Sequence, residues 1–292
     1  MRRNETRVRI SEPVNTLTLN RGLRLPGRSA EAGTPARIAI IIPACNEEVC
    51  IGPVLEELLD VIDPEKYVIA VGINNSTDRT AEIARAYPVV VTEVAARGYG
   101  HGCQEAIDGV TLLEPSVSAY IFFAGDGASD PHDLARMAAA HEQGYAMVLG
   151  ARTTRPGNWR AMTFAHVLAN VSLGAWCGLL TGRWFWDLAP LRLIERGLFE
   201  ALAPREMTFG WTIEAQVGAA MRGANICEVP AHERSRLGGE QKVSGVTWRR
   251  TFSIGCRILV AGWKARRRFG RVISAERPAR PADLIPQSQP GT

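Results

Sequence analysis

The chain has 292 residues, of which 46% are hydrophobic and 22% are charged, and this balance excludes a largely disordered protein. The formal net charge of +4 is too small to indicate nucleic acid as a partner, and none is expected. The six cysteines form no C-x-x-C pair, so neither a zinc site nor a redox pair is predicted, and the thiols fit a reducing cytoplasm.

The two ends of the chain differ from its middle. Residues 1–36 are polar, contain Gly and Pro, and lack the apolar run of a signal peptide, so a flexible N-terminal extension is predicted. Residues 271–292 are dominated by Pro, Gln, Ser and Gly, which predicts a disordered C-terminal tail. A single domain is therefore expected over residues 37–270.

Apolar runs alternate with helical patterns along this domain. Short β-branched runs predict strands at 37–43, 67–73, 89–94, 119–123, 145–150, 188–194 and 225–230. Spacing of three and four residues between apolar side chains predicts helices at 47–62, 78–86, 101–113, 131–143, 162–180, 211–222 and 246–268. This alternation predicts an α/β fold with a mostly parallel sheet covered on both faces.

Ligands of such sheets bind at the carboxyl ends of the strands, so the loops there are the candidate site. The loop after the first strand, Pro43 to Glu48, contains no glycine, and Gly98 to Gly102 has the wrong spacing for G-x-G-x-x-G. Both observations argue against a dinucleotide-dependent dehydrogenase. The loop after the fourth strand carries Asp126, whose carboxylate can hold a divalent cation against a diphosphate.

The order of these loops resembles that of family 2 glycosyltransferases. The pattern P-A-x-N-E-E is matched from Pro43 to Glu48. A segment like D-x-x-S-x-D-x-T lies at 74–80, with Asn74 in the first acidic place and with Ser76 or Thr77, Asp78 and Thr80 kept. An R-G-Y-G segment follows at 97–100, and the D-x-D signature retains only its second acid, Asp126. The resemblance runs from about residue 37 to about residue 264. It implies the GT-A fold, a Rossmann-like α/β/α sandwich that binds a nucleotide-diphospho-sugar.

The resemblance also implies a set of site residues. Those expected to bind the nucleotide-sugar are Pro43, Ala44, Asn46, Glu47, Asn74, Asp78, Gly98 and Asp126. Asp126 is also expected to act in catalysis and to hold a divalent metal, Mg²⁺ or Mn²⁺. Because Ala124 and Ala128 stand where relatives carry further acids, three alternatives remain open: one carboxylate and the diphosphate hold the metal, metal dependence is weak, or the chain is a non-catalytic homologue.

The second half of the chain resembles bacterial relatives of dolichyl- and polyprenyl-phosphate sugar synthases. The resemblance rests on D-L-x-P-x-R at 187–192, on residues 209–216, and on the Gly-rich segment 229–245. Arg234, Arg236 and Lys242 in that last segment predict a cationic clamp for phosphate oxygens, the alternative being an exposed basic loop without function.

Two further acids have alternative interpretations. Glu214, on a predicted helix, is a candidate general base that would take a proton from an acceptor hydroxyl, or else a partner in a helix-face ion pair. Asp187 is a candidate structural partner of Arg192.

Two helices bear on membrane contact. The apolar stretch His166–Thr181 is interpreted as a buried helix, because a spanning helix needs about 20 apolar residues. The helix 246–268 ends in Lys264 and three arginines, so it either lies on an anionic membrane or packs on the domain. The expected location is the cytoplasm, with peripheral contact at the inner face of the membrane.

Together these patterns predict an inverting glycosyltransferase that uses a UDP- or GDP-sugar. The expected acceptor is polyprenyl phosphate. Transfer to a hydroxyl of a small soluble molecule and a non-catalytic nucleotide-sugar-binding protein are the alternatives, and no pattern in the sequence predicts an oligomeric state.

Overall fold

One nine-stranded sheet runs through the computed structural model of the chain, which describes residues 8–9, 16–18, 36–238 and 248–276. The strand order is β1-β2-β5-β4-β3-β6-β8-β7-β9. The strands are β1 (Val8–Arg9), β2 (Thr16–Thr18), β3 (Ile38–Ala44), β4 (Tyr67–Asn74), β5 (Val90–Val94), β6 (Ala119–Phe122), β7 (Met147–Ala151), β8 (Arg192–Glu195) and β9 (Ile226–Pro230).

The pairing of the central strands brings most of their carboxyl ends to one edge. Strand β3 pairs in parallel with β4 and β6, β4 pairs in parallel with β5, and β7 pairs in parallel with β9. Strand β8 is antiparallel to both β6 and β7, so those two strands share a direction. The loops that follow β3, β4, β5, β6, β7 and β9 therefore meet at the same edge, as a mostly parallel sheet requires.

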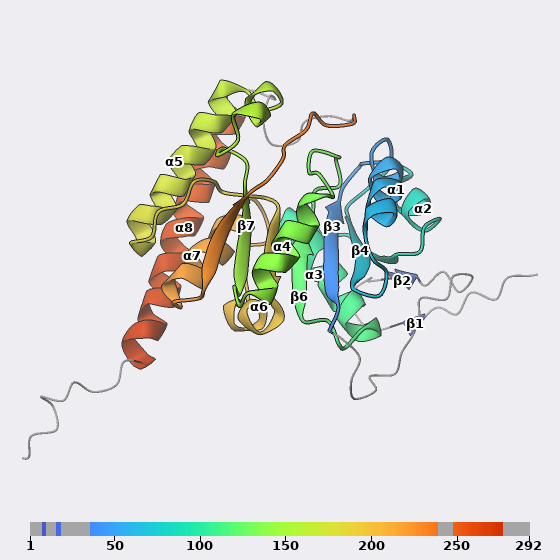
Figure 1. The fold of residues 1–292 in the computed structure, drawn as a ribbon, viewed down its shortest axis with the longest axis horizontal. Helices are drawn as coiled ribbons and strands as arrows, with labels where there is room; N and C mark the ends of the chain where they lie inside the picture. The colour runs from blue at the N-terminus through green and yellow to red at the C-terminus, as the bar shows by residue number, and fades with distance from the viewer. Residues whose placement is uncertain (1–7, 10–15, 19–35, 239–247, 277–292) are drawn as a thin grey trace, which may run out of the picture.

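Helices cover both faces of the sheet, as the sequence predicted. They are α1 (Ile51–Val61), α2 (Thr80–Ala84), α3 (Tyr99–Leu113), α4 (Asp133–Glu142), α5 (Phe164–Thr181), α6 (Arg196–Leu202), α7 (Trp211–Met221) and α8 (Trp248–Glu276), with a short 3₁₀ helix at Pro156–Arg160. One apolar core lies between the sheet and α1, α2 and α4, and the other between the sheet and α3, α5, α6, α7 and α8 (Figure 1).

The alternation of side chains in β3 explains why the sheet has two cores. Ile40 and Ile42 pack into the core beneath α1, whereas Ala39 and Ile41 pack into the core beneath α3. All four are fully buried, because successive side chains of a strand point to opposite faces. The GT-A type of α/β/α sandwich predicted from the sequence is thus the fold of this protein.

The termini of the domain differ from the prediction in three short places. Strand β2, within the expected N-terminal extension, pairs antiparallel with β5 at the sheet edge, and β1 pairs with β2. Backbone groups at an open sheet edge accept such a partner whatever its side chains, so periodicity does not reveal it. Helix α8 continues to Glu276 and passes the expected boundary at residue 270. The rest of the two predicted tails lies outside the described residues.

Helix α5 is not the buried helix that its composition predicted. Only 22% of the helix is buried, and it is the one described helix whose length and apolarity would allow it to cross a membrane. Its inner side, with Val167, Gly174, Cys177 and Leu180, packs into the core, while the outer side faces away from the domain. Figure 1 shows α5 and α8 side by side at one end of the sheet, opposite the end that carries β1 and β2.

Candidate active site

The loops after β3 and β4 are joined by reciprocal hydrogen bonds. The backbone amide of Asn46 donates to Oγ of Ser76 (3.0 Å), and Oδ1 of Asn46 accepts from the amide of Thr77 (2.8 Å). Asn46 and Asn75 both have left-handed backbone conformations, with φ of 54° and 52°, which asparagine tolerates better than most residues. The structure thus brings the predicted nucleotide-binding residues Pro43, Ala44 and Asn46 together with the β4 loop.

Asp78 holds these two loops in register. Its Oδ2 accepts from the amide of Glu48 (3.1 Å), and its Oδ1 accepts from the amide of Thr80 (3.0 Å) and is also hydrogen-bonded by the hydroxyl of Thr80. The same hydroxyl accepts from the amide of Glu47 (2.8 Å). Partial burial alone would raise the pKa of Asp78, but the hydrogen bonds from Thr80 and Glu48 lower it below its ordinary value, so the carboxylate form is favoured.

The turn before α3 lies against the loop that precedes α7. Gly98 has a φ of 149°, and a Cβ atom there would lie 2.3 Å from the carbonyl oxygen of Met207. The amide of Gly100 donates to that carbonyl (3.0 Å). Asn74 is buried beside the start of α3, where a Cβ on Gly102 would lie 2.9 Å from its Oδ1. The glycine-rich segment therefore allows close approach of backbone at the carboxyl edge.

Asp126 lies in the loop after β6 and faces Arg236. Its Oδ1 accepts from the amide of Ala128 (3.0 Å), and its Oδ2 lies 3.2 Å from Nε of Arg236. Nη2 of Arg236 also lies 3.4 Å from Oε1 of Glu47, which is buried. One guanidinium thus connects the predicted diphosphate loop with the predicted nucleotide loop, and it keeps two carboxylates close together.

Residues 231–238, here called the covering segment, cross the carboxyl edge over Asp126. The amide of Leu237 donates to the carbonyl of Asp126 (3.1 Å), and the amide of Arg234 donates to the carbonyl of Ala128 (2.8 Å). The side chain of Leu237 fills the space beside Gly127, which has a φ of 79°. A donor diphosphate would therefore meet the covering segment directly.

Arg234 and Arg236 of the predicted cationic clamp have different partners in the structure. Arg234 forms a two-pronged ion pair with Glu57 of α1 (2.5 and 2.8 Å) and donates to the carbonyl of Ser129 (2.8 Å). Its guanidinium fastens the covering segment to the domain, so its predicted role as a phosphate ligand is not supported by this geometry. Arg236 faces Asp126 and stays a candidate, and Lys242 lies outside the described residues.

Of positions 124, 126 and 128, only 126 carries an acid that could bind a divalent cation. Ala124 and Ala128 flank Asp126 in the positions where further acids were sought. Among residues 36–238 and the described part of α8, no three His, Cys, Asp or Glu side chains gather closely enough to hold a metal ion. The residues present fit a cation only as one ligand that the oxygens of a bound diphosphate would have to complete.

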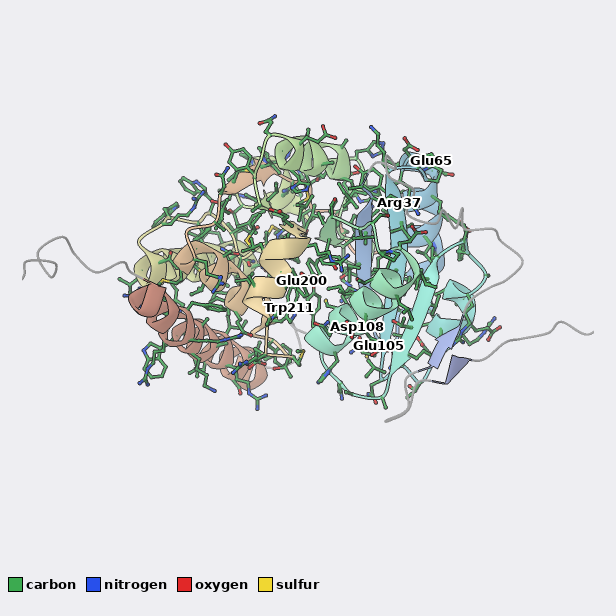
Figure 2. The ribbon with its side chains drawn as sticks, turned by 90° about the horizontal axis from the view of Figure 1, so that it is seen from below. Arg37, Glu65, Glu105, Asp108, Glu200 and Trp211 are labelled. Atoms are coloured by element: carbon green, nitrogen blue, oxygen red, sulfur yellow. The ribbon has the colours of Figure 1, made fainter. Side chains whose placement is uncertain are left out.

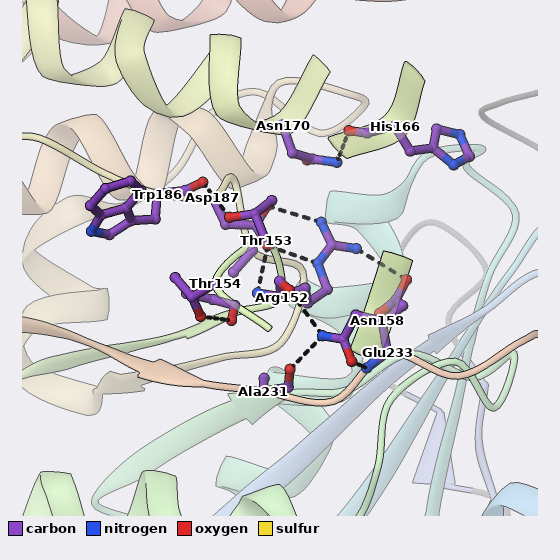
Figure 3. A network of polar contacts seen from close by, with 12 residues as sticks. Arg152, Thr153, Thr154, Asn158, His166, Asn170, Trp186, Asp187, Ala231 and Glu233 are labelled. Carbon is purple, nitrogen blue, oxygen red and sulfur yellow. Dashed lines mark hydrogen bonds and ion pairs between the residues drawn. The ribbon is translucent and has the colours of Figure 1, made fainter. Parts of the chain in front are cut away.

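A buried hydrogen-bond network that the sequence analysis missed adjoins the covering segment (Figure 3). Arg152 follows β7 directly and pairs with Asp187 through Nε (2.9 Å) and Nη2 (3.1 Å). Its Nη1 reaches Oε1 of Glu233 in the covering segment (3.2 Å). Burial raises the pKa of Glu233, the nearby Arg152 lowers it, and Asp126 raises it further, so the net direction is upward. The sequence could have indicated Arg152, because it lies in the loop that follows the predicted strand at 145–150.

Two predicted roles in the second half need correction. Asp187 pairs with Arg152 rather than with Arg192, whose buried guanidinium instead donates to the carbonyls of Ala189 and Thr212. Both carboxylate oxygens of Glu214 are engaged: Oε1 by Nη1 of Arg268 (2.8 Å) and Oε2 by two amides of the preceding loop (2.9 and 2.7 Å). These contacts assign Glu214 to joining α7 and α8 and do not support a general base.

An open groove of about 830 Å³ lies away from this site, between α3 and α6. Figure 2 labels Asp108 and Glu200 on the two helices that border it. Because β8 is antiparallel, α6 follows it at the amino-terminal edge of β6, so the groove is separated from Asp126 by the length of the sheet. The carboxyl edge, rather than the groove, carries the polar residues just described.

Comparison with known proteins agrees with this arrangement. The model of the family described as "Glycosyl transferase family 2" matches residues 39–192, which is more than half of the chain and includes the loops after β3, β4, β5, β6 and β7. The chain belongs to glycosyl transferase family 2. It is therefore a glycosyltransferase, and the carboxyl edge of its sheet is its candidate active site.

Two curated proteins match a longer part of the chain than the family model does. The chain is 29% identical over 202 residues to a protein of Haloferax volcanii named dolichyl-phosphate hexose transferase, covering 69% of this chain and 84% of the relative. It is also 29% identical over 212 residues to an uncharacterized glycosyltransferase of Mycobacterium tuberculosis, covering 71% and 90%.

Solved structures of low sequence identity share the fold. Glucosyl-3-phosphoglycerate synthase of Mycobacterium tuberculosis, in complex with Mn²⁺, UDP and phosphoglyceric acid, superposes with a TM-score of 0.58 at 18% identity, covering 79% of this chain and 78% of that one. The same enzyme with Mn²⁺, UDP-glucose and glycerol 3-phosphate gives a TM-score of 0.56 at 17% identity, covering 79% and 80%. These likenesses establish the GT-A fold.

Proposed function

We propose that this family 2 enzyme transfers a hexose from a UDP- or GDP-sugar to a polyprenyl phosphate, with inversion at the anomeric carbon. The observation that carries the acceptor class is the engagement of Glu214, whose two oxygens are bound by Arg268 and by backbone amides. A phosphate acceptor is already ionised and needs no general base. The name of the Haloferax volcanii relative, dolichyl-phosphate hexose transferase, supports the same acceptor class.

The loops of the carboxyl edge have distinct roles in this proposal. Asn46, Glu47 and Asp78, with Pro43, Ala44 and Asn74 behind them, hold the nucleobase and ribose. The turn at Gly98 admits the donor close to the backbone of α3. Asp126 and Arg236 face the diphosphate, and Arg236 exchanges its carboxylate partners for phosphate oxygens when the donor binds.

The reaction is a single displacement at the anomeric carbon. An oxygen of the acceptor phosphate forms the new bond to that carbon, while the bond to the donor diphosphate breaks and its electron pair leaves with the nucleoside diphosphate. Negative charge therefore moves onto the departing diphosphate. The guanidinium of Arg236, held ready by the covering segment, stabilises that charge, and such preorganised electrostatics is usually the largest contribution to rate.

A divalent cation belongs to the proposal only as a component of the donor complex. Solved structures of the related fold contain Mn²⁺ together with UDP. Asp126 would be its one ligand from the described part of this chain, and a bound Mg²⁺ or Mn²⁺ would help to neutralise the leaving diphosphate.

A second candidate function is transfer to a hydroxyl group of a small soluble acceptor. The raised pKa of Glu233 favours it, because a carboxylate of raised pKa beside Asp126 is suited to take a hydroxyl proton. Glu233 approaches the loop of Asp126 through a strand bridge with Ser129. The two candidates differ in their need for this carboxylate, which makes Glu233→Gln a discriminating variant.

The proposed site of action is the cytoplasmic side of the membrane. All six cysteines lie in the described part of the chain, and none forms a disulfide, which supports a reducing compartment.

The test is release of nucleoside diphosphate from a panel of UDP- and GDP-hexoses, with short-chain polyprenyl phosphate in detergent micelles or with soluble hydroxyl acceptors. We expect release that depends on the polyprenyl phosphate, is lost in Asp126→Ala, and persists within about tenfold in Glu233→Gln. Release that depends on a hydroxyl acceptor and falls about 10²-fold or more in Glu233→Gln would establish the second candidate instead. No release with any donor, from folded protein, would mark a non-catalytic homologue.

A further inference from the structure

The stretch between Arg152 and Trp186 contains no aspartate and no glutamate. It nevertheless includes the 18-residue helix α5 and the loops on either side of it, all of which have exposed residues. Its charged residues are arginines, among which Arg160 and Arg183 are exposed. A soluble surface of this length normally mixes charges of both signs, so an acid-free stretch indicates a special environment.

The outer side of α5 is apolar where a surface helix of a soluble protein would carry charges. Phe164, Leu168 and Leu179 are 78%, 56% and 76% exposed, and the exposed or half-buried Ser172 and Ala175 continue the same stripe between them. Positions three to five residues apart lie on one side of a helix. The inner side of α5 packs into the core through Cys177 and its neighbours, so the helix cannot turn the stripe inward without opening the core.

Exposed tryptophans flank α5 in the sequence. Trp159 precedes α5, Trp184 and Trp186 follow it, and each is about half exposed at 52–53%. Thr153 joins the two flanking segments, because its carbonyl accepts from Nε1 of Trp159 (3.4 Å) and its hydroxyl donates to the carbonyl of Trp186 (2.7 Å). The rings of Trp184 and Trp186 pack edge to face, with their centroids 5.7 Å apart. Tryptophans of this kind are typical of the boundary between lipid headgroups and acyl chains.

Helix α8 continues the surface with basic charge. Leu259, Val260 and Trp263 are exposed on it, and Nε1 of Trp176 on α5 donates to the carbonyl of Leu259 (3.3 Å). The sequence of α8 contains eight basic residues and one acid, Glu276. Basic side chains beside an apolar stripe are attracted to anionic lipid headgroups.

We propose that α5, the tryptophans around it and the exposed side of α8 form a docking face that lies on an anionic lipid bilayer. The helix rests in the plane of the membrane with Phe164, Leu168 and Leu179 immersed between the headgroups. The exposed basic residues Arg160, Arg183 and Lys264 contact lipid phosphates. An orientation across the bilayer does not fit the folded domain, because the inner side of α5 is packed against α7 and α8.

The docking face begins at the candidate active site. Arg152, the first residue of the acid-free stretch, binds Asp187 just beyond its other end and also binds Glu233 of the covering segment (Figure 3). A lipid phosphate arriving along the bilayer surface would therefore reach the carboxyl edge without leaving the headgroup layer. The inference deepens the proposed function and rests on it for this step, although docking itself requires neither donor nor acceptor.

A second copy of the chain could also cover the docking face. A twofold interface through this face would bring each basic residue toward its own counterpart or toward other arginines, because the stretch 152–186 provides no acid to pair with. An anionic bilayer satisfies both the apolar stripe and its basic border. Charge complementarity therefore selects the lipid surface.

Vesicle flotation of the full-length protein, without donor or acceptor, tests the docking face. We expect binding to vesicles of phosphatidylcholine with 30% phosphatidylglycerol, weakening by about tenfold or more on pure phosphatidylcholine or in 0.5 M salt. The variant Phe164→Ser/Leu168→Ser/Leu179→Ser should lose at least about tenfold in partition coefficient, because three apolar side chains no longer leave water. Leu112→Ser on α3 is the matched control, since Leu112 is 59% exposed outside the face, and it should bind like wild type.

The outcomes separate this inference from the proposed function. The inference is overturned if wild type does not bind anionic vesicles, if the triple variant binds as well as wild type, or if light scattering shows a dimer that the triple variant abolishes in the absence of lipid. The melting-temperature shift with nucleotide-sugar should be the same in the triple variant and wild type, which confirms that the variant is folded and its donor site intact. Vesicle binding without sugar transfer to polyprenyl phosphate would leave docking in place and reject the acceptor.

Discussion

The guanidinium of Arg236 lies between two carboxylates of the candidate active site, 3.2 Å from Asp126 and 3.4 Å from Glu47. The three residues come from the covering segment, the β6 loop and the β3 loop, which are far apart in the sequence. Without the arginine, the two acids would face each other across the place proposed for the diphosphate. The side-chain cation of Arg236 thus lies at the place proposed for the anionic donor diphosphate.

Replacing Arg236 with glutamine should weaken UDP binding by about ten- to a hundredfold, because a charge-assisted hydrogen bond contributes about 1.5–3 kcal/mol and two repelling acids would remain. Isothermal titration calorimetry measures the affinity. Arg196→Gln is the control, since Arg196 pairs with Glu200 on α6 away from the carboxyl edge, and it should change UDP affinity less than about threefold. Equal affinity in Arg236→Gln and wild type would exclude Arg236 from the diphosphate site.

Divalent metal should stabilise the protein only together with nucleotide. Fewer than three metal-binding side chains gather near Asp126 among the described residues, and Arg236 already pairs with Asp126, so 1 mM Mn²⁺ alone should leave Tm unchanged. UDP alone should raise Tm, and UDP with Mn²⁺ should raise it further, because ligands that bind the folded state stabilise it by mass action. Differential scanning fluorimetry of wild type and Asp126→Ala measures this. A Tm increase with Mn²⁺ alone that Asp126→Ala abolishes would show a preformed metal site and contradict the expectation.

Glu214→Gln should lower stability rather than alter catalysis by proton transfer. The substitution leaves Arg268 without its carboxylate partner and weakens the hydrogen bonds from two backbone amides, so we expect the free energy of unfolding to fall by about 1–3 kcal/mol. Urea unfolding measures the loss, and a double-mutant cycle with Arg268→Gln should show coupling between the two positions. If kcat fell more than about 10²-fold and no longer depended on pH, while stability was unchanged, Glu214 would again be a candidate general base.

Much of the fold and part of the site follow from the sequence alone. The buried run Ile38–Ala44 is apolar on both faces because helices cover both faces, and this is readable as a parallel strand. The loops at Asn46, Asp78 and Asp126 were found because they follow such strands. Their convergence on one edge is a consequence of parallel pairing, which requires no knowledge of side-chain geometry.

Pairing between charged residues distant in sequence was not readable. Arg234 and Arg236 look alike in the sequence, yet one pairs with Glu57 of α1 and the other faces Asp126. Asp187 pairs with Arg152 and not with Arg192, which is nearer in the sequence, because the chain returns to the end of β7 before it enters β8. The exposure of α5 was also missed, since an apolar helix has the same composition whether a core or a membrane covers it.

Asp78 should contribute stability at neutral pH that is lost in acid. Its pKa is lowered by the hydrogen bonds from Thr80 and Glu48, so the folded state favours the carboxylate more than the unfolded state does. For an acid with a lowered pKa, that contribution is present above the ordinary value of 3.8 and disappears as the pH falls through the lower folded value. The variant Asp78→Asn should therefore be less stable than wild type at pH 7, by about 1 kcal/mol after allowing for solvent screening.

Urea unfolding of wild type and Asp78→Asn at pH 7, 5 and 3.5 measures this difference. We expect this stability difference to stay nearly constant from pH 7 to pH 5 and to narrow below pH 3.8, because Asp78 then begins to take up a proton in the unfolded state. Asp60→Asn, on the exposed side of α1, is the control and should show a difference within about 0.5 kcal/mol at each pH. Because the same carboxylate aligns the loops of Asn46 and Ser76, Asp78→Asn should also weaken UDP binding at pH 7. A stability difference that grows on acidification would mean that Asp78 is destabilised as a carboxylate in the folded protein, which its hydrogen bonds contradict.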